Sequence, residues 1–210
     1  VARRRRGVTR RHRDYTIHGC YDADAITSHD GVPVVHAALA VIGTAMLQGF
    51  VDGVMTADAA LHRQVTTREE LAHWLARQRH VPGVMRARAA VAAADHRCES
   101  PGETRLRLVL TWLGLEVVPQ HAVRDATGQL MGRVDFLLPA LGVVVEFDGA
   151  VKYGGPADHG TRALVAEKHR EDAIRALGYA VVRVTWADLD YPARIEARIR
   201  EAARISRRAG

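Results

Sequence analysis

The sequence predicts an α/β layered domain in its C-terminal half, preceded by a small helical domain. From Val34 to about Arg97 the chain is rich in alanine, and its apolar residues recur at helical spacing. After Gly114 the apolar period becomes strand-like, and strands then alternate with helices. We therefore expect three parts: a basic arm over residues 1–30, a helical domain over 31–97 and the α/β domain over 98–210.

The composition favours a globular protein of the cytoplasm. Of 210 residues, 48% are apolar, which is enough for a packed core. The longest apolar run, VVHAALAVIGTAML from Val34, is shorter than the roughly 18 to 20 residues of a membrane-spanning helix. No secretory apolar segment follows the basic start, so we expect a cytoplasmic location. Cys20 and Cys98 form no CxxC pair, which argues against a disulfide framework or a thiolate metal site.

Positive charge indicates a polyanionic partner. The net charge is +6 and the isoelectric point about 9.9, a balance that favours nucleic acid over a membrane. Residues 1–13 hold seven arginines, among them Arg3, Arg4, Arg5 and Arg6. Such a block of like charge is expected to be either a solvated tail or a clamp on nucleic-acid phosphates.

The helical domain is expected to contain three or four short helices. Thr67 and Glu70 form a capping box ahead of Leu71, so one helix starts there. No catalytic residue types cluster in this region, and packing and orientation of the following domain are its expected roles. The expected breaks between helices are Gly49, Gly53, Thr66 and Pro82.

The α/β domain opens with a well-marked helix. Ser100 is a natural N-cap, Pro101 suits the first helical position, and Glu103 closes a capping box. The helix is expected to reach Trp112, with Gly114 ending it. The elements expected next are strands 115–123, 133–138 and 143–147, a helix 163–177, a strand 181–184 and a helix 192–205. Residues 143–147 form a β-branched run typical of a central strand covered on both faces.

Three carboxylates fall on this predicted sheet. Glu146 and Asp148 are two residues apart on one strand, so they share a face, and Asp135 lies on the neighbouring strand. Carboxylates that converge repel one another unless a cation or proton compensates, and Mg²⁺ favours oxygen ligands. The pattern therefore predicts a site for Mg²⁺ or Mn²⁺ held by Asp135, Glu146 and Asp148.

Two lysines follow the acids. Of thirty basic residues only Lys152 and Lys168 are lysines. A compact ammonium near a metal site can stabilise developing charge or position water, which favours a catalytic role for both, although chance explains their location equally well.

A series of motifs resembles the PD-(D/E)xK nuclease superfamily, and within it a domain of unknown function related to very-short-patch repair endonucleases. The similar segments cover nearly all of residues 98–190. They are ESPGETRLR, PQ, GRVDF, VVVEFDGAVKY, EKHREDAIRALGY and VVRVTWADL.

The resemblance implies a restriction-endonuclease-like core and a metal-dependent phosphodiesterase site. Asp135 and Glu146 would be the metal-binding acids, and Glu103 the acid supplied by the first helix. The family's lysine position holds Asp148 here, and Lys152 would replace the missing ammonium. Because many superfamily members act as dimers, a homodimer is a further expectation.

The segment from Gly31 to Arg97 also resembles actinobacterial proteins described as type IV, abortive-infection antitoxin-like or regulator-like. Those proteins usually begin with a winged-helix module, and the thirty residues before Gly31 are too few for one.

Several candidate site residues have two possible roles. Glu103 can cap its helix or bind metal, and Asp148 can form a turn with Gly149 or bind metal. Gln120 can reach the site or satisfy an edge strand. Arg170 can contact a phosphate or lie on a solvated helix face, and Trp112 and Trp186 can be core aromatics or stack on a base.

Three functions compete at this stage. The first is a divalent-metal-dependent endonuclease that hydrolyses phosphodiester bonds in DNA. Its catalytic candidates are Asp135, Glu146, Lys152, Glu103 and Lys168. Its expected contacts to nucleic acid are Arg3, Arg4, Arg5, Arg6, Gln120 and Arg170. The second is a DNA-binding regulator or antitoxin-like protein that retains the fold without turnover. The third is a scaffold for a partner protein.

Overall fold

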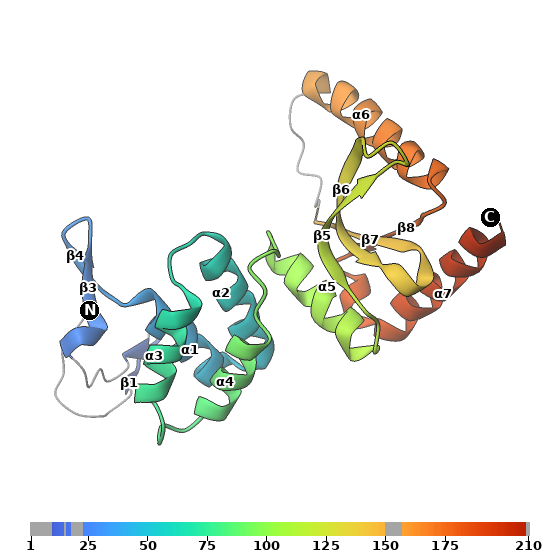
Figure 1. The fold of residues 1–210 in the computed structure, drawn as a ribbon. Coiled ribbons are helices and arrows are strands. Elements are labelled where there is room, and N and C mark those ends of the chain that lie inside the picture. Colours follow the sequence, from blue (N-terminus) through green and yellow to red (C-terminus); the bar gives the residue numbers. More distant parts are fainter. Residues whose placement is uncertain (1–9, 15, 18–22, 150–156, 209–210) are drawn as a thin grey trace. The chain divides into compact units, whose positions relative to one another are not determined.

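The chain forms two compact units, Val1–Asp95 and His96–Gly210. The computed structural model describes residues 10–14, 16–17, 23–149 and 157–208, drawn as coloured ribbon in Figure 1. Among these residues no helix combines the length and the apolarity that crossing a membrane requires. Arg3 to Arg6 and Lys152, which carry predicted roles, lie outside the described residues.

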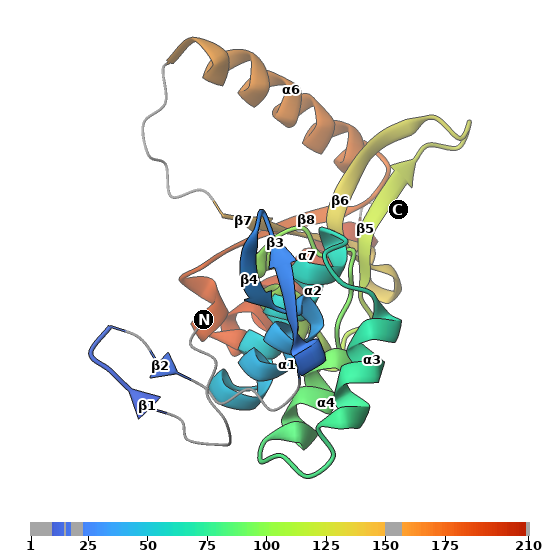
Figure 2. The same cartoon turned by 90° about the vertical axis from the view of Figure 1, so that its left-hand side faces the viewer.

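The N-terminal unit begins with two antiparallel strand pairs that the sequence analysis did not predict. Strand β1 (Arg10–Arg11) pairs with β2 (Thr16–Ile17), and after the 3-10 helix η1 (Ala23–Ala25), β3 (Ile26–His29) pairs with β4 (Val32–Val35), as Figure 2 shows. The β3–β4 turn is Asp30-Gly31, with φ of 50° and 76°. Two positive φ angles suit a two-residue hairpin, so this Asp-Gly turn places a strand where a helix from Val34 was expected.

Four helices follow the hairpin: α1 (Ala37–Gln48), α2 (Phe50–His62), α3 (Arg68–Arg77) and α4 (Val84–Ala92). The capping box of Thr67 and Glu70 at the start of α3 is confirmed. The expected breaks at Gly49, Thr66 and Pro82 lie between helices, but the break at Gly53 is wrong because Gly53 lies inside α2. A Cβ at Gly53 would overlap Ala45 of α1 and touch Ala90 of α4, so this glycine permits close helix packing.

The C-terminal unit has the expected order of helix, three strands, helix, strand and helix. Its elements are α5 (Pro101–Trp112), β5 (Val118–Arg124), β6 (Leu130–Leu138), the 3-10 helix η2 (Pro139–Leu141), β7 (Val143–Asp148), α6 (Ala157–Ala176), β8 (Ala180–Thr185), the 3-10 helix η3 (Asp188–Asp190) and α7 (Pro192–Arg208). The first strand starts later than expected because the Leu115 N–H donates to the Leu110 carbonyl at 3.1 Å and completes the helix end at Gly114.

The sheet is mixed and has the order β5-β6-β7-β8. Strand β6 runs antiparallel to both β5 and β7, whereas β7 and β8 are parallel. The β-branched strand β7 is therefore central, as predicted, and Val143, Val144 and Val145 are fully buried.

Two apolar cores cover the two faces of this sheet. Helices α5 and α7 supply Leu106, Leu110, Ile195 and Ile199 to the larger core, which includes Phe136 of β6. Helix α6 supplies Ile174 to the smaller core on the other face, as the placement of the helices in Figure 1 shows. The central strand is thus held from both sides, which fixes the position of the polar residues that end it.

We predict opposite effects for two glycine substitutions in the N-terminal unit. Gly53→Ala should lower the free energy of unfolding by about 1–2 kcal/mol, because the added methyl group overlaps Ala45. Gly43→Ala, inside α1 with no atom near its Cβ position, should raise it by about 0.5–1 kcal/mol. Urea unfolding of both variants measures this, and a stabilised Gly53→Ala protein would contradict the packing described.

Candidate functional site

The acids of β6 and β7 meet where the two strands stop pairing. Phe136 pairs with Val145, so Asp135 and Glu146, one residue beyond each, lie opposite one another. The Phe147 N–H donates to the Asp135 carboxylate at 2.7 Å. Asp135 is half-buried, and the Glu146 side chain is 13% exposed. Two partly buried carboxylates therefore stand side by side at this point of the sheet.

Glu103 adds a third carboxylate from the first turn of α5. It is buried, and its Oε1 accepts from the Ser100 hydroxyl at 2.8 Å while the Glu103 N–H donates to that hydroxyl at 3.2 Å. Its Oε2 accepts from the Glu99 N–H at 2.9 Å. Ser100 is the N-cap of α5 and Pro101 its first residue, as predicted. The Glu103 carboxylate, however, accepts from the N–H of Glu99, the residue before the N-cap. Glu103 thus caps α5.

Gln120 on β5 directs Glu103 toward the other acids. Its side-chain amide donates to Glu103 Oε2 at 2.9 Å. Its neighbours Pro119 and His121 pair with Phe136 and Val134, so Gln120 lies opposite Asp135. The φ of Gln120 is +52°, a left-handed conformation that costs free energy for a residue other than glycine and is concentrated at functional sites. Gln120 thus contacts Glu103, and its contact with nucleic acid stays a prediction.

The three carboxylates act on one another. The pKa of Asp135 is raised from its ordinary 3.8 to about 6, mainly by burial and to a smaller extent by the charges of Glu103 and Glu146. The Phe147 N–H and Arg170 oppose this increase in the pKa. Ionised Asp135 is therefore disfavoured by its burial and by the two neighbouring carboxylates, and a cation bound there would favour the ionised form.

Arg170 of α6 supplies the nearest positive charge. Its guanidinium donates to Glu146 Oε1 at 2.7 Å, to Glu167 Oε2 at 2.8 Å and to the Arg133 carbonyl at 3.1 Å. A Cβ on Gly132 would crowd the Arg170 stem at 3.0 Å, so this glycine makes room for it. The interpretation of Arg170 as part of a solvated helix face is wrong, because its side chain is only 24% exposed and pairs with Glu146.

A second arginine extends this network; the sequence suggests Arg183 as a partner of Asp135, whereas the structure places it beside Glu146. Arg183 of β8 lies 3.7 Å from Glu146 and donates to Glu167 at 2.9 Å and to Glu171 at 2.8 Å. The hydrogen bond from Arg170 lowers the pKa of Glu167. The parallel register of β7 and β8 pairs Glu146 with Arg183. This register is known only when the two strands are aligned, so the sequence alone does not indicate the contact.

The remaining predicted residues are not gathered at this point. Asp148 ends β7 and is exposed, and Lys168 is exposed on α6. In the part of the chain that the structure describes, no three His, Cys, Asp or Glu side chains are close enough to hold a metal ion. The shared site of Asp135, Glu146 and Asp148 is therefore not formed here. Trp112 and Trp186, at 65% and 40% exposed, are not core aromatics.

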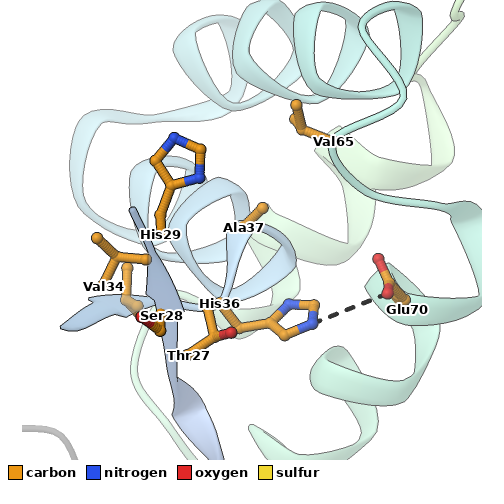
Figure 3. Close-up of a pocket in the computed structure, with 9 residues that line it drawn as sticks. Thr27, Ser28, His29, Val34, His36, Ala37, Val65 and Glu70 are labelled. Atoms are coloured by element: carbon orange, nitrogen blue, oxygen red, sulfur yellow. Dashed lines mark ion pairs between the residues drawn. The ribbon is translucent and has the colours of Figure 1, made fainter. Parts of the chain in front are cut away.

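The N-terminal unit contains a separate open pocket of about 420 Å³ between the β3–β4 hairpin and helices α1 and α3 (Figure 3). His36 and Glu70 face each other across it at 3.8 Å. Each already caps a helix, since His36 accepts from the Ala38 N–H and Glu70 completes the Thr67 capping box. The facing pair His36 and Glu70 is thus explained by helix capping.

Comparison with known proteins identifies relatives without a described activity. No family model matches the chain. Two uncharacterized proteins from two strains of Mycobacterium tuberculosis are each 31% identical over 156 residues, or 74% of this chain. The chain spans about half the length of these curated relatives, 56% of each.

One solved structure is similar in part. The catalytic domain of the homing endonuclease I-Bth0305I matches 50% of this chain and 95% of its own length, with 16% identity and a TM-score of 0.37. At that TM-score the two folds are not shown to be the same.

We predict that Asp135→Asn stabilises the metal-free protein only at higher pH. Because the folded-state pKa is raised, the neutral carboxyl is fully stabilising below pH 3.8, and this contribution is lost as the pH rises to about 6. The asparagine variant should therefore be more stable by about 1–3 kcal/mol at about pH 8 and equal to the parent at about pH 4. Thermal unfolding in EDTA measures this, with exposed Asp172→Asn as the control. A variant less stable at both pH values would contradict the charge crowding.

Removal of Arg170 should have the opposite effect. Arg170→Met leaves Glu146 beside Asp135 without its closest cation, and should lower the free energy of unfolding in EDTA by about 1–3 kcal/mol. Arg175 of the same helix, whose side chain is 50% exposed and pairs with Glu171, gives the control, and Arg175→Met should cost less than about 0.5 kcal/mol. Equal losses in the two variants would show that Arg170 acts as an ordinary surface arginine.

Proposed function

We propose that the C-terminal unit is the catalytic part of a divalent-metal-dependent endonuclease that hydrolyses phosphodiester bonds in DNA. The observation that carries the proposal is the pair of carboxylates formed by Asp135 and Glu146 on adjacent strands, with Glu103 of α5 near enough that its charge also raises the pKa of Asp135. A protein does not need to concentrate like charges in this way for stability alone, so a positive ligand is the simplest reason for the arrangement.

The residues present suit a hard divalent cation. Asp135 and Glu146 offer carboxylate oxygens from adjacent strands, the ligand type that Mg²⁺ and Mn²⁺ prefer, and they would hold the ion. Bound there, the ion would supply polarisation of a phosphodiester oxygen and a lowered pKa for bound water. Glu103, oriented by Gln120 and Ser100, would complete the negative charge around it.

Arg170 would orient Glu146 and could turn to a substrate phosphate, because its guanidinium has several donors on a flexible stem. Lys168 lies two residues before Arg170 on α6 and is exposed, so it is available to a phosphate or to an attacking water. Lys152 and the arginines at positions 3 to 6 are proposed as further contacts to the reacting phosphate and to the DNA backbone.

DNA is the proposed substrate because of charge and because of the motif series described above. The net charge of +6 suits a phosphate polymer, since each contact with a lysine or arginine releases counterions. The same chemistry would act on RNA, so both polymers belong in the test.

A second function, a DNA-binding regulator without turnover, is favoured by one observation. Arg170 pairs with Glu146 at 2.7 Å, and Asp148 stands at the position where the nucleases that the motifs resemble have lysine, so the acids are engaged by an arginine in place of the expected lysine. Such a protein would bind DNA in a salt-dependent way, and its binding would not respond to a change at Glu146.

We predict cleavage of supercoiled plasmid in Mg²⁺ or Mn²⁺ and none in EDTA. Glu146→Gln and Asp135→Asn should each lower the rate by at least about 10²-fold, the scale on which a lost electrostatic stabiliser lowers kcat. Glu196→Gln, which removes a surface carboxylate of α7 paired with Arg200, should leave the rate unchanged. An inactive parent on both DNA and RNA, with binding insensitive to Glu146→Gln, would replace the endonuclease with the regulator.

A further inference from the structure

An exposed tryptophan lies at the same end of the sheet as the acids. Trp186 directly follows Thr185, the last residue of β8, and Thr185 pairs with Asp148 at the end of β7. Because β7 and β8 are parallel, Trp186 follows the end of β8 next to the end of β7, where Glu146 and Asp148 lie. The residue is 40% exposed, an unusual position for a large aromatic ring beside a charged site.

The ring is held by its neighbours. Phe147 packs edge-on against Trp186, with ring centroids 5.1 Å apart and an angle of 86° between the planes. Phe147 in turn rests against Gly102 of α5, where a Cβ would overlap its ring. The Trp186 side chain therefore has a defined place, set by the helix that also carries Glu103.

The loop after Trp186 is fixed as well. Asp188 accepts from the Thr185 N–H at 2.8 Å and from its hydroxyl at 2.9 Å, and pairs with Arg198 at 3.3 Å. Tyr191, at the other end of this loop, is 52% exposed. A rigid turn with two exposed aromatics loses little conformational entropy when a flat ligand binds.

Positive charge accompanies both rings. The Arg105 guanidinium lies over the Trp186 ring at 5.8 Å from its centroid, and that of Arg194 lies over the Tyr191 ring at 4.4 Å. Arg105 also pairs with Asp190 at 3.3 Å. Aromatic rings interleaved with arginines are the composition of surfaces that stack unpaired nucleobases while holding the adjoining phosphates.

We propose that Trp186, with Arg105 beside it, is a stacking platform for an unpaired nucleobase of the substrate. The inference rests on the proposed function for the identity of the polymer and adds the structural class it prefers: a strand with a base outside the double helix, as in single-stranded, looped or frayed DNA. Charge and ring together favour such a base over an apolar protein surface, because Arg105 and Arg194 lie beside the rings, where the phosphates that adjoin a stacked base would be.

Binding without metal tests the platform separately from cleavage. Fluorescein-labelled single-stranded DNA and a fully paired duplex of equal length would be titrated with the 210-residue chain in EDTA, and anisotropy recorded. The parent should bind the single strand more tightly than the duplex. Trp186→Leu should weaken single-strand binding about ten-fold or more, the scale of one lost stacking contact, with little change for the duplex.

Two further variants define the contact. Trp186→Phe retains an aromatic face and should recover most of the single-strand affinity. Trp112→Leu removes an exposed tryptophan from the other end of α5, and should behave like the parent. Thermal unfolding of each variant verifies that the fold is intact.

Equal weakening for single strand and duplex, or equal effects of Trp186→Leu and Trp112→Leu, would overturn the platform. Single-strand preference that depends on Trp186 in a protein without cleavage activity would support the platform while the endonuclease fails. Cleavage of paired DNA that is unaffected by Trp186→Leu would support the endonuclease and overturn the platform.

Discussion

The partial burial of two adjacent carboxylates, Asp135 and Glu146, at the end of a central strand is the constraint around which the C-terminal unit is arranged. Glu146 ends a run of valines that must be buried on both faces, and Asp135 is brought beside it by the same strand pairing that builds the core. Arg170 offsets this charge, and Gly132 leaves the space its stem needs. The position of α6 on the sheet is thus fixed by electrostatics at one end and by the apolar contact of Ile174 further along the helix.

Local signals predicted much of this fold. The N-cap at Ser100, the capping box at Thr67 and the glycine that ends α5 are short-range patterns, and each is found where expected. The order of strands and helices followed from periodicity, and the central place of β7 from its unbroken valines. Asp135 and Glu146 could be proposed as neighbours because strand pairing and side-chain alternation are regular.

What escaped prediction depends on contacts between residues distant in sequence or on a single dihedral angle. Gly53 resembles a helix break in sequence, yet its role is to let Ala45 and Ala90 approach α2. The partnership of Arg170 with Glu146 spans twenty-four residues and requires the helix to be docked first. The left-handed backbone of Gln120 has no signature in its side chain, because a strained residue persists only where the surrounding contacts over-determine it.

The contact between Gly102 and Phe147 bears on which ion such a site would accept. Phe147 lies between Glu146 and Asp148 in the chain and donates its N–H to Asp135, while its ring lies flush against α5 one residue before Glu103. The helix and the strand are therefore kept at a fixed spacing, and Glu103 cannot shift freely relative to the proposed ligands Asp135 and Glu146. Because Ca²⁺ needs more ligands at longer distances than Mg²⁺, a spacing fixed in this way favours the smaller cation. The preference for Mg²⁺ over Ca²⁺ would then depend on Gly102, although Gly102 is not a ligand of the ion.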